Sequence, residues 1–228
     1  SALSKMLTKT LKKQAILRIA DVLRARGDFT ASISFLDSIY NTHQTLEIKN
    51  KLVEIHLFSG KPDTALIMID EIFLTIMPTN KYFNDLMELR DIINFYYVKV
   101  DEKNKEGFIS YLKSESLLKQ RKISEANQLL KNIIKQNEGQ KIFPLLSLRR
   151  AIILTKLDKY NEALDILINL KNTIYSDRGE IMSGQIFEQI YGDNAAAMTH
   201  YMKVINNFPN SIFSEPIRYH IRRLKSNE

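Results

Sequence analysis

Apolar residues recur every three or four positions along most of the 228-residue chain. This spacing is typical of one face of an amphipathic helix. Three stripes show it most clearly, over residues 65–76, 123–134 and 160–170. No stretch of comparable length alternates apolar and polar residues with a period of two, so we expect little or no sheet. The pattern predicts an all-α protein.

Stop signals divide this pattern into segments of about 14–20 residues, a usual length for helices. Glycine provides a left-handed cap at the end of a helix, and proline cannot continue a helix interior. The chain has only 7 glycines and 5 prolines, too few for a sandwich or barrel with many tight turns. The signals stand at Gly27-Asp28, 60–62, 77–80, Phe143-Pro144, Gly192-Asp193 and 208–211.

Five of the expected turns share one arrangement of residues, which indicates an internal repeat. A small residue follows each turn, and a large apolar residue stands four positions after it. The small residues are Ser32, Ala65, Ala126, Ala163 and Ala197. They are separated by 33, 61, 37 and 34 residues, and three of these intervals match the period of a two-helix repeat, about 34 residues. We therefore expect antiparallel helix pairs that pack closely where the small residues lie.

The first helix of each expected pair carries a weaker signal. Ala20 and Ala151 each stand seven residues before their turn, where a small side chain is expected, and Val53 and Ser114 fill that place less well. Gly184 stands eight residues before Gly192 rather than seven. That repeat therefore has either a one-residue slip or a false register.

These features resemble the tetratricopeptide repeat family over nearly the whole chain. The family places a small residue midway along its first helix, a Gly-Asp-Tyr-like turn, an alanine early in its second helix and a proline after it. The match is degenerate, because no repeat carries the family's early tryptophan and only Pro209 stands clearly in the proline position. The resemblance implies an all-α, right-handed solenoid of stacked antiparallel helix pairs.

The stretch 192–224 is similar to bacterial cell-envelope members of the family, in which a turn like Phe208-Pro209-Asn210-Ser211 introduces the next helix. This similarity favours the cell envelope or periplasm over the cytoplasm and leaves the compartment open. Because the chain begins with Ser1 rather than methionine, we expect it to be part of a longer protein. No apolar run approaches the length of about 18 residues that a membrane-spanning helix needs.

The 61-residue interval predicts one extra long helix over residues 82–100, followed by a charged break over residues 101–107. An unpaired helix changes the up-and-down order of a stack, so we place a joint near the break. The expected domains are residues 1–100, with the first repeats and the extra helix, and residues 107–228, with the later repeats. The final helix, residues 215–225, is expected to cap the array.

The sequence contains none of the motifs that carry common catalytic chemistry. It has no cysteine, which excludes disulfides, thiolate metal sites and cysteine nucleophiles. It has no phosphate-binding loop, dinucleotide fingerprint or serine-hydrolase elbow. Its four histidines, at positions 43, 56, 200 and 220, include no pair spaced as a helical zinc site requires. We expect no catalytic residue, cofactor or metal, and a hydrolase on a helical scaffold is the least favoured alternative.

The positive net charge of the chain indicates an alternative function. The net charge is +7, and basic residues gather in residues 1–26 and in the last helix. Such a surface attracts anionic partners. Nucleic-acid binding through the basic termini is therefore the alternative to protein binding, although acidic residues interrupt the basic runs in between.

The resemblance also implies a binding surface, because first helices line the concave side of such repeats. Register places a mixture of charged, amide and aromatic residues there, which suits a protein or peptide partner. The candidates are Arg18, Asp21, Arg24, Asn50, Lys51, Glu54, Tyr111, Glu115, Lys119, Arg149 and Lys156, and Glu47 falls in the same register. Leu17 and Asp21 stand where the family's clamp for acidic chaperone tails needs Lys and Asn. The identity of the partner and the oligomeric state stay open.

Overall fold

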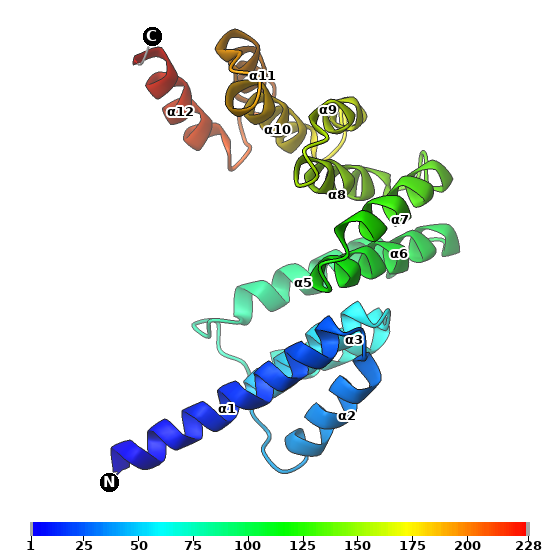
Figure 1. The fold of residues 1–228 in the computed structure, drawn as a ribbon, viewed down its shortest axis with the longest axis vertical. Coiled ribbons are helices and arrows are strands. Elements are labelled where there is room, and N and C mark those ends of the chain that lie inside the picture. The colour runs from blue at the N-terminus through cyan, green and yellow to red at the C-terminus, as the bar shows by residue number, and fades with distance from the viewer. Residues whose placement is uncertain (1, 227–228) are drawn as a thin grey trace. The chain divides into compact units, whose positions relative to one another are not determined.

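The computed structural model describes residues 2–226, with side chains described over residues 10–225. These residues form twelve α-helices and no strand, so the predicted all-α fold is confirmed (Figure 1). The chain divides into two compact units, residues 1–129 and 130–228. We describe each unit by itself. The division into residues 1–100 and 107–228 expected from the sequence stays a prediction.

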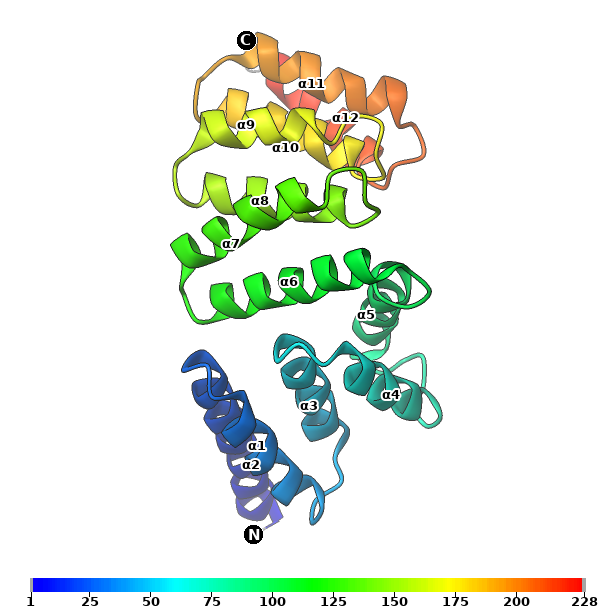
Figure 2. The ribbon, with the colours of Figure 1, turned by 90° about the vertical axis from the view of Figure 1, so that its right-hand side faces the viewer.

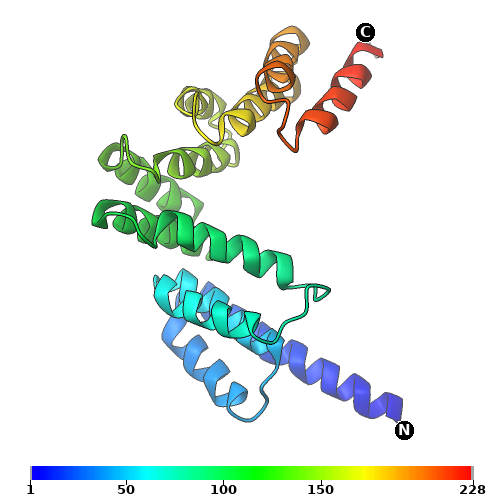
Figure 3. The ribbon, with the colours of Figure 1, turned by 180° about the vertical axis from the view of Figure 1, so that it is seen from behind.

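The first unit contains two helix hairpins, an extra helix and the start of a third hairpin. Its helices are α1 (Ala2–Ala25), α2 (Phe29–Tyr40), α3 (Leu46–Phe58), α4 (Pro62–Phe73), α5 (Phe83–Tyr96), α6 (Glu102–Lys119) and the beginning of α7 (Ile123–Gln136). Helix α1 packs on α2 and α3, and α6 packs on α3. Helix α5 lies between α4 and α6 (Figure 2). The N-terminal half of α1 projects past α2 (Figure 3).

The second unit continues with two more helix hairpins and a final helix. After the end of α7 come α8 (Phe143–Thr155), α9 (Tyr160–Ile168), α10 (Ser176–Gln189), α11 (Asn194–Asn207) and α12 (Ser214–Ser226). Helix α8 pairs with α9, and α10 pairs with α11. The expected capping helix is α12. It packs Ile217 and Ile221 against a cluster that contains Tyr201 and Val204.

The small residues of the repeat pattern share one environment in all five helix pairs. Ser32, Ala65, Ala126, Ala163 and Ala197 are each fully buried. Their counterparts on the first helices, among them Ala20 and Gly184, are buried as well. The one hydroxyl in the set has a partner, because Ser32 Oγ donates to the carbonyl of Ala20 at 3.0 Å. This confirms the prediction that the helices of a pair approach closely at these positions.

Each of the five predicted turns ends its first helix with one residue in the left-handed region. Its φ is +83° at Gly27, +80° at Gly60, +63° at Arg121, +57° at Asp158 and +65° at Gly192. In the first four turns the next N–H bonds to the carbonyl five residues back, as in a Schellman cap.

The fifth turn differs by one residue. There Asp193 N bonds to the carbonyl of Phe187, six residues back. The irregular spacing of Gly184 and Gly192 is therefore a genuine one-residue slip at the end of α10, and the register of that repeat is correct.

The charged segment 101–107 differs from the helix pattern expected from the sequence. The expected break is wrong, because residues 102–107 form the first turns of α6. Asp101 caps this helix, with its carboxylate accepting from Asn104 N at 2.9 Å. That backbone hydrogen bond holds the pKa of Asp101 below its ordinary value. Carboxylates are favourable at a helix N-terminus, so a charged, apolar-poor run begins a helix here. The predicted extra helix is confirmed, but it ends at Tyr96.

Candidate protein-binding face

Four of the predicted partner-binding residues meet in a closed ring of ion pairs between α1 and α3. Asp21 Oδ1 accepts from Arg24 Nη2 at 3.0 Å and from Lys51 Nζ at 3.1 Å. Glu54 Oε2 accepts from Lys51 Nζ at 2.6 Å, and its Oε1 lies 3.3 Å from Arg24 Nη1. We call these four residues the α1–α3 ring. It alternates two cations and two anions, so its net charge is zero.

Helical spacing explains why the ring closes. Asp21 and Arg24 are three residues apart on α1, and Lys51 and Glu54 are three apart on α3, so each pair shares a helix face. The two cationic side chains are only 12% and 17% exposed, which limits screening by solvent and keeps their geometry defined. The ring therefore presents both signs of charge at fixed places on adjoining first helices.

A further ion pair extends the ring toward the start of α3. Lys13 Nζ pairs with Glu47 Oε1. This hydrogen bond is the main reason that the pKa of Glu47 lies below its ordinary value of 4.5. Glu47, Lys51 and Glu54 follow one another at intervals of four and three residues, so they lie along one stripe of α3. The stripe faces α1 over about two turns.

The other candidates in the first unit lie on helices α1, α3 and α6. Arg18 is exposed on α1, and Asn50 is half-buried on α3. On α6, Tyr111 stacks on Phe108 with ring centroids 6.0 Å apart. Lys119 is exposed and places its Nζ 5.9 Å from the ring of Phe58, which belongs to α3. Glu115 is half-buried on the same helix. The first unit therefore brings candidates from α1, α3 and α6 onto adjoining helices.

The two remaining candidates, Arg149 and Lys156, belong to the second unit. Arg149 is half-buried on α8, and Lys156 is exposed at the end of that helix. The α1–α3 ring belongs to the first unit, so we describe these two residues apart from it. Their role in binding stays a prediction.

Over residues 10–225, no three His, Asp or Glu side chains are grouped so that they could hold a metal ion. His56 lies half-buried in α3. This burial lowers the pKa of its side chain and favours the neutral imidazole. Within residues 2–226, no helix is long and apolar enough to cross a membrane.

Sequence reasoning missed a cavity in the second unit, bounded by α9, α10 and α11. Its volume is 580 Å³, and its lining includes Lys171, Glu180, His200 and Lys203. These residues come from the second helix α11, the first helix α10 and the turn between α9 and α10, so first-helix register alone does not find them. The signal available in the sequence was the pair of small residues Gly179 and Ser183 on α10.

Comparison with known proteins identifies the repeat. A family model described as tetratricopeptide repeat matches residues 181–211, which cover most of α10 and all of α11. Residues 181–211 form a tetratricopeptide repeat. The predicted resemblance is thereby confirmed, and the other helix pairs repeat its packing of small residues and its turns. The similarity of the C-terminal part to bacterial cell-envelope members stays a prediction.

Two solved structures are similar to the chain at 13% sequence identity. The crystal structure of MamA aligns with 81% of this chain and 91% of its own, with a TM-score of 0.41. The structure of PilF from Pseudomonas aeruginosa aligns with 91% of this chain and 97% of its own, with a TM-score of 0.39. No curated protein sequence matches the chain.

Proposed function

We propose that this helical-repeat protein is a non-catalytic scaffold that binds a protein partner along the first-helix face of α1, α3 and α6. The observation that carries the proposal is the α1–α3 ring, because predicted partner-binding residues of two successive repeats lie together on adjoining first helices. The tetratricopeptide repeat at residues 181–211 supports it, since stacked helix pairs offer extended surfaces to partners.

The ring suits recognition of an extended peptide segment. Its members are already paired, so the face carries no isolated, partly buried charge that would destabilise the free protein. A bound segment gains hydrogen bonds from side chains whose positions are held by their neighbours, which lowers the entropy lost on binding. Exposed Arg18 and half-buried Asn50 add further polar contacts on the same two helices.

A fourfold charge swap tests this face without breaking its internal pairing. The variant combines Asp21→Lys, Arg24→Glu, Lys51→Glu and Glu54→Lys, which reverses every charge of the ring and keeps the net charge. Its matched control swaps Lys49→Glu with Glu71→Lys, a pair that joins α3 to α4 at 2.8 Å. We expect both variants to keep the helical circular-dichroism signal.

The measurement is photocrosslinking from a reactive group at position 18 in extracts of the cells that make the protein. We expect one defined polypeptide to be captured by the parent and the control, and capture to fall at least tenfold in the ring swap. Loss of about 1.4 kcal/mol of complementary charge interaction is enough for that change. Equal capture by the ring swap and the control would refute binding at this face.

Nucleic-acid binding through the basic termini stays the alternative prediction. In α12, Arg218 pairs with Glu215, so part of the basic charge is matched within the helix. Lys5 and Lys9 lie outside the residues whose side chains the structure describes. That the protein has no enzymatic activity is likewise a prediction.

A further inference from the structure

We infer that the cavity bounded by α9, α10 and α11 is a second binding site, which takes a short extended peptide segment with a carboxylate next to an apolar side chain. We call it the α10 cavity. It lies in the second unit and contains no residue of the α1–α3 ring. It therefore adds a separate point of attachment to the proposed scaffold function.

Small residues on α10 create the hollow. Helix α10 presents Ser176, Gly179 and Ser183 to it, while the end of α9 and the face of α11 form its sides. Ser183 Oγ donates to the carbonyl of Gly179 at 2.9 Å, so its hydroxyl stays against the helix. On α11 the lining extends from His200 to Phe208, which is about 12 Å at 1.5 Å per residue. That length matches three or four residues of extended chain.

One side of the cavity is apolar. Leu167 and Ile168 line it from α9, and Phe208 lines it from the end of α11. Ile168 is 70% exposed, which is high for a large aliphatic side chain next to a cavity. An apolar side chain of a ligand would cover this surface and remove it from water, which favours binding. This part of the cavity therefore favours a ligand with an aliphatic or aromatic group.

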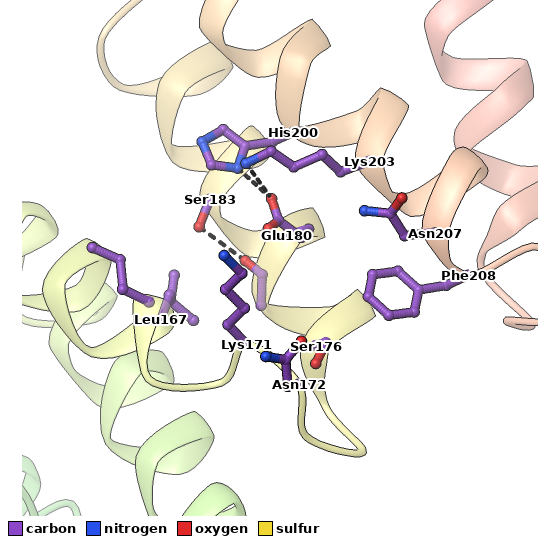
Figure 4. A pocket seen from close by; sticks show the side chains of 12 residues that line it. Leu167, Lys171, Asn172, Ser176, Glu180, Ser183, His200, Lys203, Asn207 and Phe208 are labelled. Carbon is purple, nitrogen blue, oxygen red and sulfur yellow. Dashed lines mark hydrogen bonds and ion pairs between the residues drawn. The ribbon is translucent and has the colours of Figure 1, made fainter.

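The other side is basic. Glu180 Oε2 accepts a hydrogen bond from His200 Nδ1 at 2.6 Å and lies 3.3 Å from Lys203 Nζ (Figure 4). One carboxylate therefore pairs with two nitrogen groups. Lys171 reaches into the same cavity from the turn after α9, and among the side chains described over residues 10–225 it has no carboxylate at ion-pair distance. Two lysines against one glutamate leave a positive excess beside the apolar wall.

The remaining polar groups suit a peptide rather than a simple anion. Asn172 and Asn207 line the cavity with side-chain amides. An amide offers both a donor and an acceptor, which is what the backbone of an extended peptide requires. Charge, apolar surface and length together specify a carboxylate-bearing segment of three or four residues.

The test uses acetylated, amidated tetrapeptides and the intact 228-residue chain labelled with ¹⁵N. The probe is Leu-Asp-Leu-Ser, and its matched control is Leu-Asn-Leu-Ser, which lacks the carboxylate. Inorganic phosphate serves as a third ligand. We expect the aspartate peptide to shift the amide resonances of Gly179 and Ser183 and the side-chain amide of Asn207 in a saturable way, and to bind at least tenfold tighter than the asparagine peptide.

Paired variants test the contacts at exposed side chains. Lys171→Gln is compared with Lys225→Gln, an exposed lysine of α12 that does not line the cavity. Ile168→Ser is compared with Ile190→Ser, which is 45% exposed and lies at the end of α10. We expect Lys171→Gln to weaken binding of the aspartate peptide roughly tenfold, because it removes a charge-assisted contact. We expect Ile168→Ser to weaken binding by a similar factor, because it removes apolar surface that the ligand would cover. Each control should leave binding unchanged.

Three results would overturn the inference. One is the lack of saturable shifts at millimolar aspartate peptide, and another is equal binding of the asparagine peptide. The third is binding of phosphate with the same shifts and affinity, which would make the cavity a simple anion site. Because the ring swap on α1 and α3 leaves every lining residue intact, failure here is distinguishable from failure of the proposed first-helix face.

Discussion

At the scale of single residues, the repeat depends on where a side chain must be small. Gly184 is the clearest case. A Cβ atom there would lie 2.5 Å from Cε1 and 2.8 Å from Cδ1 of Tyr201, whose ring is almost fully buried. In the first repeat the equivalent places are taken by Ala20 and Leu36, which lie in one buried cluster. At Gly184 the choice of glycine thus follows from the size of the side chain opposite.

Gly184→Ala is therefore expected to destabilise the protein by roughly 1–3 kcal/mol, the usual range for overpacking a core. Urea denaturation followed by circular dichroism measures the change. Gly179→Ala is the matched control, because the nearest atom to its added Cβ is Leu170 Cβ at 3.3 Å, a much milder contact. Equal losses in the two variants would mean that the close approach of Tyr201 does not determine the choice of glycine.

At the scale of elements, the last helix is held by a polar contact as well as by its apolar face. Glu188 of α10 accepts from Tyr201 Oη of α11 and from His220 Nε2 of α12, each at 2.7 Å. Burial opposes the charge of this carboxylate, but the hydrogen bonds from His220 and Tyr201 outweigh it, so the pKa of Glu188 lies below its ordinary 4.5. Burial, together with the same hydrogen bond, raises the pKa of Tyr201. Three helices are thus joined at one carboxylate.

Because the pKa of Glu188 is lowered in the folded protein, the stability of the folded state decreases as pH falls through the acidic range. The unfolded chain takes up the proton first as pH falls, so the stabilisation is complete above about pH 4.5 and is lost below it. Hydrogen exchange of the α12 amides, corrected for intrinsic rates, should show constant protection from pH 7 to 5.5 and weaker protection below 4.5.

Glu188→Gln should lower protection of α12 about tenfold even at pH 7, because a hydrogen bond to a charged group contributes about 1.5–3 kcal/mol. Glu215→Gln is the control, since Glu215 is 77% exposed and pairs only within α12. If both variants keep full protection at neutral pH, the carboxylate of Glu188 does not anchor the helix.

At the scale of the whole molecule, the net charge of +7 is distributed over a chain that pairs many of its cations. The ring binds Arg24 and Lys51, Lys49 pairs with Glu71, and Arg90 pairs with Asp70. A paired cation neutralises phosphate less effectively than an unpaired one, because its carboxylate partner must be separated from it. The positive excess alone is therefore a weak basis for nucleic-acid binding.

We expect 20-nucleotide single- and double-stranded probes to form no complex with micromolar protein at ~150 mM salt, measured by fluorescence anisotropy. Any binding at ~50 mM salt should be weak and non-specific. A log–log salt dependence with a slope near −5 or steeper, together with retained binding at ~150 mM, would instead favour the nucleic-acid alternative, because such a slope reports about six phosphate contacts.

Much of the candidate site was predictable, but its pairing was not. First-helix register selected Asp21, Arg24, Lys51 and Glu54 because residues at fixed positions of a repeat face the same way. Which charges meet depends on how α1 and α3 align, and the paired residues are about 30 positions apart in sequence. The α10 cavity was not predictable from that register, since three of its four ionisable side chains come from α11 and the turn between repeats.

The sequence by itself determined the helices, their pairing and the positions where they touch. Short-range physics is sufficient for this, because amphipathic period, turn residues and side-chain size act over at most a few dozen residues. Even so, the left-handed residues at Arg121 and Asp158 needed the structure, since neither is glycine and only the helix caps require that conformation. The tertiary structure alone decided which charges pair and where a cavity opens, because both depend on side chains that packing brings together from separate helices.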